Sequence, residues 1–196
     1  MKARAGFTSA GLALLLGWSA HASIIIDFNR GGGDDNAPIP QGYGSTEEVT
    51  VEYLTPMLHW TSGYGALTEA AFSASPNAYA LIALTPKPGY QITLERVDIG
   101  NWAGYAYWAS ISVLDADGSI LSTWDYVMKG VLNRPFDNVN LTSTEGLIIK
   151  LGPTWDIAID NIQFAATPVP EPTTLFAGSL LLLPFGESAW RMLRKK

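Results

Sequence analysis

One carboxylate interrupts an apolar pattern near the end of the sequence. Asp160 stands in phase with Ala158, Ile162 and Phe164, so a regular strand would turn its carboxylate toward the same face as those side chains. A buried charge requires a partner. A calcium ion is one such partner for Asp160, because calcium binds carboxylate and carbonyl oxygens as ligands. Backbone amides are an equally good partner, if Asp160 and Asn161 cap the amides at a strand end or a bulge. The sequence leaves both interpretations open.

Four aromatic residues fall within eight positions in the stretch NWAGYAYW at 101–108. Sugar rings present an apolar C–H face that packs on a flat aromatic side chain, while nearby Asn and Asp side chains bond the hydroxyls. We therefore predict a carbohydrate site at Trp102, Tyr105 and Trp108. The alternative is that Tyr107 and Trp108 only begin the next strand. Other large aromatic residues are predicted in the core or at its rim: Trp60, Tyr64, Trp124 and Trp155.

Two acidic stretches resemble cation-binding loops more weakly. The stretch GGGDDN at 31–36 occurs once, without a repeat, so we interpret it as an acidic loop. In DADG at 115–118 the glycine comes two places too early for an EF-hand, and Tyr126 stands where that loop requires a bidentate Glu. This stretch is therefore predicted to be a turn.

Catalytic groups are harder to find. His59 is the only histidine after position 21, and no Ser or Cys nucleophile stands in an arrangement that it would serve. Paired carboxylates of the glycosidase kind remain open, because separation in sequence says nothing about separation in space. A non-enzymatic protein is the main prediction, and a carbohydrate-active hydrolase is the alternative.

The composition limits the partners. Residues 23–168 hold six Lys and Arg against sixteen Asp and Glu, a net charge of −10. Nucleic acid is excluded as a partner because phosphate binding needs a basic surface. The chain has no cysteine, which removes disulfides and makes a zinc site improbable. An acidic surface suits cations and neutral sugars.

The elements that position these residues are predicted to be short β-strands. Alternating or β-branched runs separated by turn residues favour strands at 24–28, 49–53, 79–84, 90–100, 107–113, 120–126, 147–151 and 156–164. A weak helical pattern covers 66–72. We predict one antiparallel β-sandwich of the jelly-roll type over 23–168. Its core is predicted to contain Ile111, Val113, Ile149 and Ile159.

Both ends of the chain carry export signals. Residues 1–22 combine a basic start, an apolar run and a small-x-small sequence at Ala20–Ala22, which indicates a signal peptide. At the other end, 169–196 reads VPEP, then an apolar run and a basic cluster. A helix from Leu175 to Leu193 would reach about 28 Å, which is close to the thickness of a bilayer core.

The order of these parts resembles the PEP-CTERM sorting family of exopolysaccharide-producing Gram-negative bacteria. In that family an exosortase reads the tail. The resemblance implies a sorting motif at Val169, Pro170, Glu171 and Pro172, a transient membrane anchor after it, and export to the cell surface. It also implies processing near the motif, with exosortase as the partner at the inner membrane.

The strands carry a second resemblance. An Asp-Phe pair near the start, Gly42-Tyr43-Gly44, and the closing run from Asp156 to Phe164 are similar to the galactose-binding-like jelly rolls common in PEP-CTERM proteins. In similar jelly rolls the first and last strands lie side by side and share a calcium site. The resemblance therefore implies calcium as a cofactor, with Asp27 and Asp160 as its ligands, in a surface protein that binds or organises exopolysaccharide.

Overall fold

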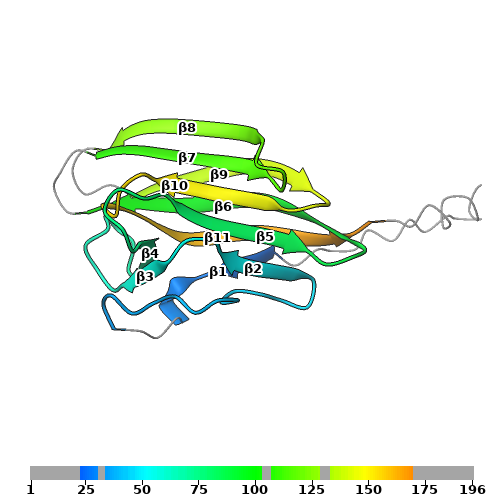
Figure 1. Cartoon of the computed structure of the whole chain (residues 1–196), viewed down its shortest axis with the longest axis horizontal. Helices are drawn as coiled ribbons and strands as arrows, with labels where there is room; N and C mark the ends of the chain where they lie inside the picture. The colour runs from blue at the N-terminus through cyan, green and yellow to red at the C-terminus, as the bar shows by residue number, and fades with distance from the viewer. Residues whose placement is uncertain (1–22, 31–33, 103–106, 129–132, 170–196) are drawn as a thin grey trace, which may run out of the picture.

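Antiparallel strands make up most of the described chain, which in this computed structural model comprises residues 23–30, 34–102, 107–128 and 133–169. They form two sheets that pack against each other (Figure 1). The first sheet has the order β3-β4-β11-β6-β9, and β1 also pairs with β11. Its strands are β1 (Ser23–Ile26), β3 (Met57–Trp60), β4 (Ala70–Ser73), β6 (Tyr90–Asn101), β9 (Asn133–Ser143) and β11 (Ile157–Pro168).

The second sheet has the order β2-β5-β10-β7-β8. Its strands are β2 (Val49–Tyr53), β5 (Ala80–Pro86), β7 (Tyr107–Asp115), β8 (Ile120–Met128) and β10 (Leu147–Gly152). One 3-10 turn, η1 (Phe28–Arg30), follows β1. Because both sheets are antiparallel and share one core, the predicted β-sandwich is confirmed.

A single hydrophobic core fills the space between the sheets, and it takes alternate residues from the strands on both sides. The four predicted core residues, Ile111, Val113, Ile149 and Ile159, are all at most 1% exposed. The turn predicted at 115–118 is also confirmed, since β7 pairs with β8 as a hairpin and the turn between them is closed by a bond from the Gly118 amide to the Asp115 carbonyl.

Three segments differ from the sequence prediction. Neither β3 nor β9 was among the predicted strands. The helix expected over 66–72 is wrong, because 70–73 form β4, which pairs with β3 on one side and β11 on the other. Alanine and glutamate favour helices when isolated. Here pairing with two neighbours and the burial of Ala71 and Phe72 on opposite faces outweigh that preference.

A bulge divides β11 into two halves. The residues that face the main core are Ile157, Ile159, Ile162 and Phe164, so the alternation slips by one residue between 159 and 162. The slip occurs at Asn161, whose φ of 48° suits asparagine better than most residues. Asp160 therefore does not share the face of Ile162 and Phe164. The expected phase is right for Ala158, which lies with Asp160 on the face away from the main core, and wrong for Ile162 and Phe164 because it assumed a regular strand.

Several predicted segments lie outside the described residues: the signal peptide at 1–22, the glycines at 31–33, Tyr105, and the tail from Pro170 onward. Within the ranges that are described, no helix is both long and apolar enough to cross a membrane. The membrane segment predicted after Pro172 belongs to the part that is not described.

Candidate ligand-binding site

The face of the first sheet that points away from the main core carries a second, aromatic cluster. Its buried members are Tyr64, Leu67, Ala70, Phe72 and Ala158, and Leu58, Trp60 and Trp102 pack against them. Strand alternation explains why these residues meet. In β4, Ala71 faces the main core while Phe72 faces the cluster, and in β3 the buried Met57 and the half-buried Trp60 divide in the same way.

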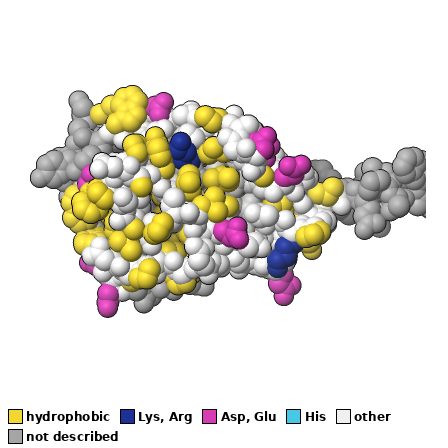
Figure 2. Space-filling view, viewed as in Figure 1, with side chains coloured by type: hydrophobic (Ala, Val, Ile, Leu, Met, Phe, Trp, Pro, Cys, Tyr) yellow, Lys and Arg dark blue, Asp and Glu magenta, His cyan; other side chains and the backbone are white. Residues whose placement is uncertain are grey.

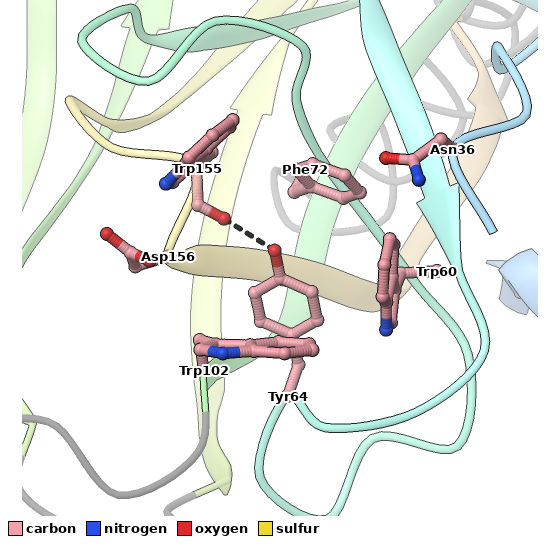
Figure 3. Close-up of a pocket in the computed structure, with 7 residues that line it drawn as sticks. All are labelled: Asn36, Trp60, Tyr64, Phe72, Trp102, Trp155 and Asp156. Atoms are coloured by element: carbon pink, nitrogen blue, oxygen red, sulfur yellow. Dashed lines mark hydrogen bonds between the residues drawn. The ribbon is translucent and has the colours of Figure 1, made fainter.

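A pocket of about 280 Å³ opens in this cluster, and we call it the aromatic pocket (Figure 3). It is lined by Asn36, Trp60, Tyr64, Phe72, Trp102, Trp155 and Asp156. The rings of Trp60 and Trp102 lie 5.4 Å apart at 85°. Tyr64 packs 5.2 Å from Trp102 at 65°. These edge-to-face contacts are the favoured geometry for aromatic pairs, and they fix the walls of the pocket at steep angles to one another.

Two glycines allow the chain to approach these rings closely. Gly63 has a φ of 96°, and a Cβ built there would lie 2.7 Å from the indole of Trp102. A Cβ on Gly100 would overlap the carbonyl oxygen of Tyr64. The backbones of Tyr64 and Trp102 also form a β-bridge. The indole is therefore held against the backbone, which limits its motion.

Polar groups lie at the edge of the aromatic pocket. The Tyr64 hydroxyl donates to the carbonyl oxygen of Trp155 at 2.6 Å (Figure 3). The Trp102 amide donates to the carbonyl oxygen of Asp156 at 2.8 Å. Figure 3 shows Asn36 and Asp156 on opposite sides of the aromatic rings. The Asp156 carboxylate accepts a bond from the Thr154 hydroxyl through one oxygen, at 2.8 Å.

The two predicted sugar-binding residues that the structure describes, Trp102 and Trp108, do not lie together. Trp102 lines the aromatic pocket, and Tyr105 lies outside the described residues. Trp108 is 59% exposed in β7, in the second sheet. It lies opposite Val127 on β8. Figure 2 shows apolar side chains gathered over β5, β7 and β10 of that sheet. The described pair, Trp102 and Trp108, therefore belongs to two different surfaces.

Three residues of the aromatic pocket were predicted only as core or rim residues. Tyr64 is buried in the second cluster and Trp60 packs against it, as predicted, but together with Trp155 they also line the aromatic pocket, which was not predicted. Their signal in the sequence was weak, because β3 was not recognised and its alternation could not be used. Trp124 packs against the main core, 5.9 Å from Phe136, as expected.

The second predicted site surrounds Asp160, which is 2% exposed. One carboxylate oxygen accepts from the amides of Asn161, at 2.7 Å, and Phe28, at 3.3 Å. The other accepts from the Asn161 side chain at 3.2 Å. Asp160 therefore caps backbone amides at the bulge, which is one of the two interpretations that the sequence left open. Asp27 bonds the Asn29 amide at 2.7 Å, and its own carbonyl accepts from the Tyr43 hydroxyl.

Asp160 belongs to a connected polar network. The Asn161 side chain also donates to Asp98 at 3.1 Å, and Asp98 is 3% exposed. Arg96 pairs with Asp98 through two nitrogens, at 2.9 and 3.2 Å, and with Asp137 at 3.3 Å. We call these five residues the acidic network. Each of its two buried carboxylates is bonded by donors from the protein itself.

Burial raises the pKa of Asp160 to about 6. Bonds from the amides of Asn161 and Phe28 oppose this shift, and the negative charges of Asp27 and Asp98 add to it. Asp27 is thus close enough to interact with Asp160 electrostatically, as a shared site would require. However, no group of three or more His, Cys, Asp or Glu side chains is arranged to hold a metal ion among the residues that the structure describes.

The weaker acidic stretches behave as the sequence predicted where they are described. Asp117 accepts from the Ser119 amide at 2.8 Å, within the β7–β8 turn. Asp35 accepts from the amide and hydroxyl of Thr61, each at 2.8 Å. Both carboxylates are therefore used in holding loops.

Comparison with known proteins gives likeness of structure only. No family model matches the chain, and the search of curated proteins found no match. A DUF4465 family protein from Bacteroides caccae is similar in structure, with a TM-score of 0.42 and 11% identity, covering 73% of this chain and 98% of that one. The carbohydrate-binding module TmCBM61, solved with β-1,4-galactotriose, gives a TM-score of 0.31 and 14% identity, covering 63% and 90%.

The arabinose-bound α-L-arabinofuranosidase MgGH51 gives a TM-score of 0.33 at 9% identity, covering 74% of this chain and 26% of that enzyme. At these scores and identities none of the three carries an argument about ligands. The case for function has to come from the aromatic pocket itself.

Proposed function

We propose that this protein binds carbohydrate through the aromatic pocket and does so without catalysis. The observation that supports this most is the combination of two indole walls, Trp60 and Trp102, with polar groups at the edge of the same pocket. A pyranose ring needs both features, an aromatic surface for its C–H face and polar atoms for its hydroxyls. Trp155 is 47% exposed and offers further aromatic surface at the pocket.

A matched pair of tryptophan variants tests this proposal. Trp102→Ala removes a wall of the aromatic pocket, and Trp108→Ala removes an exposed indole from the other sheet. A glycan array with the wild-type chain first identifies binding sugars. We expect Trp102→Ala to weaken binding at least tenfold and Trp108→Ala to change it less than twofold. The reverse ranking would move the site to the second sheet, and loss of binding in neither variant would contradict the proposal.

The alternative, a cell-surface hydrolase, has less support from the same residues. Glycosidases of the usual kind place two carboxyl groups across the bond that they cleave. Of the seven described residues that line the aromatic pocket, Asp156 is the one acid. Release of reducing sugar from a bound polysaccharide, abolished by Asp156→Asn, would favour the hydrolase over the binding protein.

We further propose that the sandwich is a jelly roll of the galactose-binding-like type, exported and processed by exosortase at the motif that begins with Val169. The resemblance of both ends of the sequence to the PEP-CTERM family supports the export and processing. The similarity of Gly42-Tyr43-Gly44 and of the closing run from Asp156 to Phe164 supports the jelly-roll type. Intact-mass analysis of the surface-released protein should show that both Met1–Ala22 and the basic end are gone. Replacing 170–172 with alanines should leave the tail attached. A released chain that still carries Arg194–Lys196 would contradict the processing proposal.

A further inference from the structure

The aromatic pocket has the shape of a corner. Its walls meet steeply, since the ring planes of Trp60 and Trp102 stand at 85° and those of Trp60 and Phe72 at 77°. A sugar that packs its face on one indole therefore meets the other wall with its edge. Consecutive residues of a polysaccharide chain would need aromatic faces arranged side by side along a groove. Perpendicular walls favour one ring and block the continuation of a chain through the pocket.

The depth and the volume of the aromatic pocket both suit the binding of a single sugar ring. Tyr64 and Phe72 are 5% and 4% exposed, so both are almost completely covered by protein. Pockets that bury drug-sized ligands measure about 300 to 1,000 Å³. At about 280 Å³ the aromatic pocket lies just below that range, which suits one hexose and is too small for three.

Widening the pocket would be costly, because its walls are tied to the backbone. Gly63 lies against the indole of Trp102, and Gly100 lies against the carbonyl of Tyr64. The Tyr64 hydroxyl in turn holds the carbonyl of Trp155. These contacts join the segment around Gly63 with the end of β6 and the loop between β10 and β11. A groove that extends past Trp102 would require all three to separate.

The charge of the pocket selects against acidic sugars. The seven described lining residues include one acid, Asp156, and no Lys or Arg. One oxygen of that carboxylate bonds the Thr154 hydroxyl. Uronic acids would bring a second negative charge next to Asp156, with no basic side chain among those seven to offset it.

We infer that the aromatic pocket binds one neutral sugar residue end on, at a chain terminus or a side branch, and excludes uronic acids and chain interiors. This inference rests on the proposed function and makes it specific. The protein would then attach to the ends or branches of a polysaccharide, so its binding capacity would follow the number of ends rather than the total mass of polymer.

The test uses calorimetry with the full-length chain and a panel of methyl glycosides of glucose, galactose, mannose, rhamnose and N-acetylglucosamine. The neutral glycoside that binds most tightly is then compared with its homo-oligomers of two to four units. It is also compared with the matching uronide if it is a hexose that has one, and with methyl glucuronide if it is not. We expect the tetramer to bind within about threefold of the monomer and the uronide to bind at least tenfold more weakly. Asp156→Asn should reduce the difference for the uronide to about threefold.

Each result has a distinct meaning. Affinity that rises tenfold or more with each added unit would overturn single-ring binding while leaving the proposed function in place. Equal binding of the uronide and the neutral glycoside, or a difference that Asp156→Asn leaves unchanged, would overturn the charge argument. If neither the panel nor an array of polysaccharides binds, the proposed function itself fails.

Discussion

The aromatic pocket and the acidic network are neighbours on the same face of the first sheet, yet they are built in opposite ways. Ala158 belongs to the aromatic cluster, and Asp160, two residues further along β11, belongs to the acidic network. At the pocket, polar groups such as Asn36 and Asp156 lie among the residues that line an open cavity. In the network, both oxygens of Asp160 accept bonds from the protein itself.

This difference separates binding from stability. Polar atoms that line a cavity can exchange water for a ligand, whereas buried carboxylates that already hold internal donors would have to give up those bonds first. The comparison therefore predicts that changes in the acidic network alter stability and leave sugar affinity alone. Changes in the aromatic pocket should alter sugar affinity, with smaller effects on stability than changes in the acidic network.

The largest effect is expected at Asn161. Asn161→Ala places alanine at a φ of 48° and removes the bonds to Asp98 and Asp160. Strain of roughly 1–2 kcal/mol and the loss of two bonds to carboxylates should lower the free energy of unfolding by about 4 kcal/mol, as measured by urea denaturation. Asn140→Ala is the matched control, because Asn140 is exposed at the same φ.

The control variant Asn140→Ala should lose only the part of the free energy of unfolding that comes from backbone strain, about 1–2 kcal/mol. Equal losses in the two variants would mean that the acidic network contributes nothing beyond backbone strain. A parallel loss of sugar affinity in Asn161→Ala, measured well below its unfolding transition, would break the separation between the two regions.

A smaller effect concerns pH. The pKa of Asp160 is raised from 3.8 to about 6, so between these values the folded chain binds a proton that the unfolded chain does not. The ionised group therefore costs stability above pH 6, and this cost disappears as the pH falls from about 6 to 4. At about 1.4 kcal/mol per pKa unit the change is about 3 kcal/mol.

Asp160→Asn should remove this pH dependence, because the amide cannot ionise and its oxygen can still accept from the Phe28 and Asn161 amides. The measurement is urea denaturation of both chains at pH 4.5 and 7. Wild type should gain stability relative to Asp160→Asn at the lower pH. A constant difference across this range would show that the pKa of Asp160 is not raised.

Tyr64 tests the pocket side of the comparison. Tyr64→Phe keeps the ring contacts with Trp102 and Phe72 but removes the bond to the Trp155 carbonyl. We expect a loss of about 1 kcal/mol in stability and a loss of sugar affinity of roughly threefold, because Trp155 is no longer held in place. Tyr79→Phe is the control, because Tyr79 is exposed and lies just before β5 of the other sheet. Unchanged affinity in Tyr64→Phe would show that Trp155 takes no part in binding.

The sandwich was predictable because its signals are local. Alternation in 107–113 and 147–151 assigned Ile111, Val113 and Ile149 to the core, and DADG at 115–118 fixed the hairpin. β4 was not predictable in the same way. Its sequence AAFS has no strong strand preference of its own, and it becomes a strand because β3 and β11 lie beside it.

The candidate site was predictable only in part, for a similar reason. The cluster of aromatic residues at 101–108 drew attention to Trp102, which lines the aromatic pocket. The residues that line the pocket together with Trp102 include Trp60 and Trp155, which are distant from it in the sequence. They reach the pocket only because β3, β4 and β11 pair with one another. The slip at Asn161 was equally hidden, because one residue at a positive φ reverses the face of every residue after it.

The smallest expected effect is that of calcium at Asp27 and Asp160, which stays a prediction. An ion would neutralise the charges that raise the pKa of Asp160, but it would compete with the amides of Phe28, Asn29 and Asn161 for the same oxygens. We therefore expect a weak site, with a dissociation constant near the 1 mM end of the range for extracellular modules. At a free calcium concentration equal to that constant, binding adds about 0.4 kcal/mol to the free energy of unfolding, or roughly 2 °C to the melting temperature.

Thermal melts in 1 mM calcium and in chelator measure this shift, and Asp160→Ala should abolish it while Asp117→Ala, in the β7–β8 turn, should not. A melt of the wild-type chain that is indifferent to calcium would leave amide capping as the whole role of Asp160.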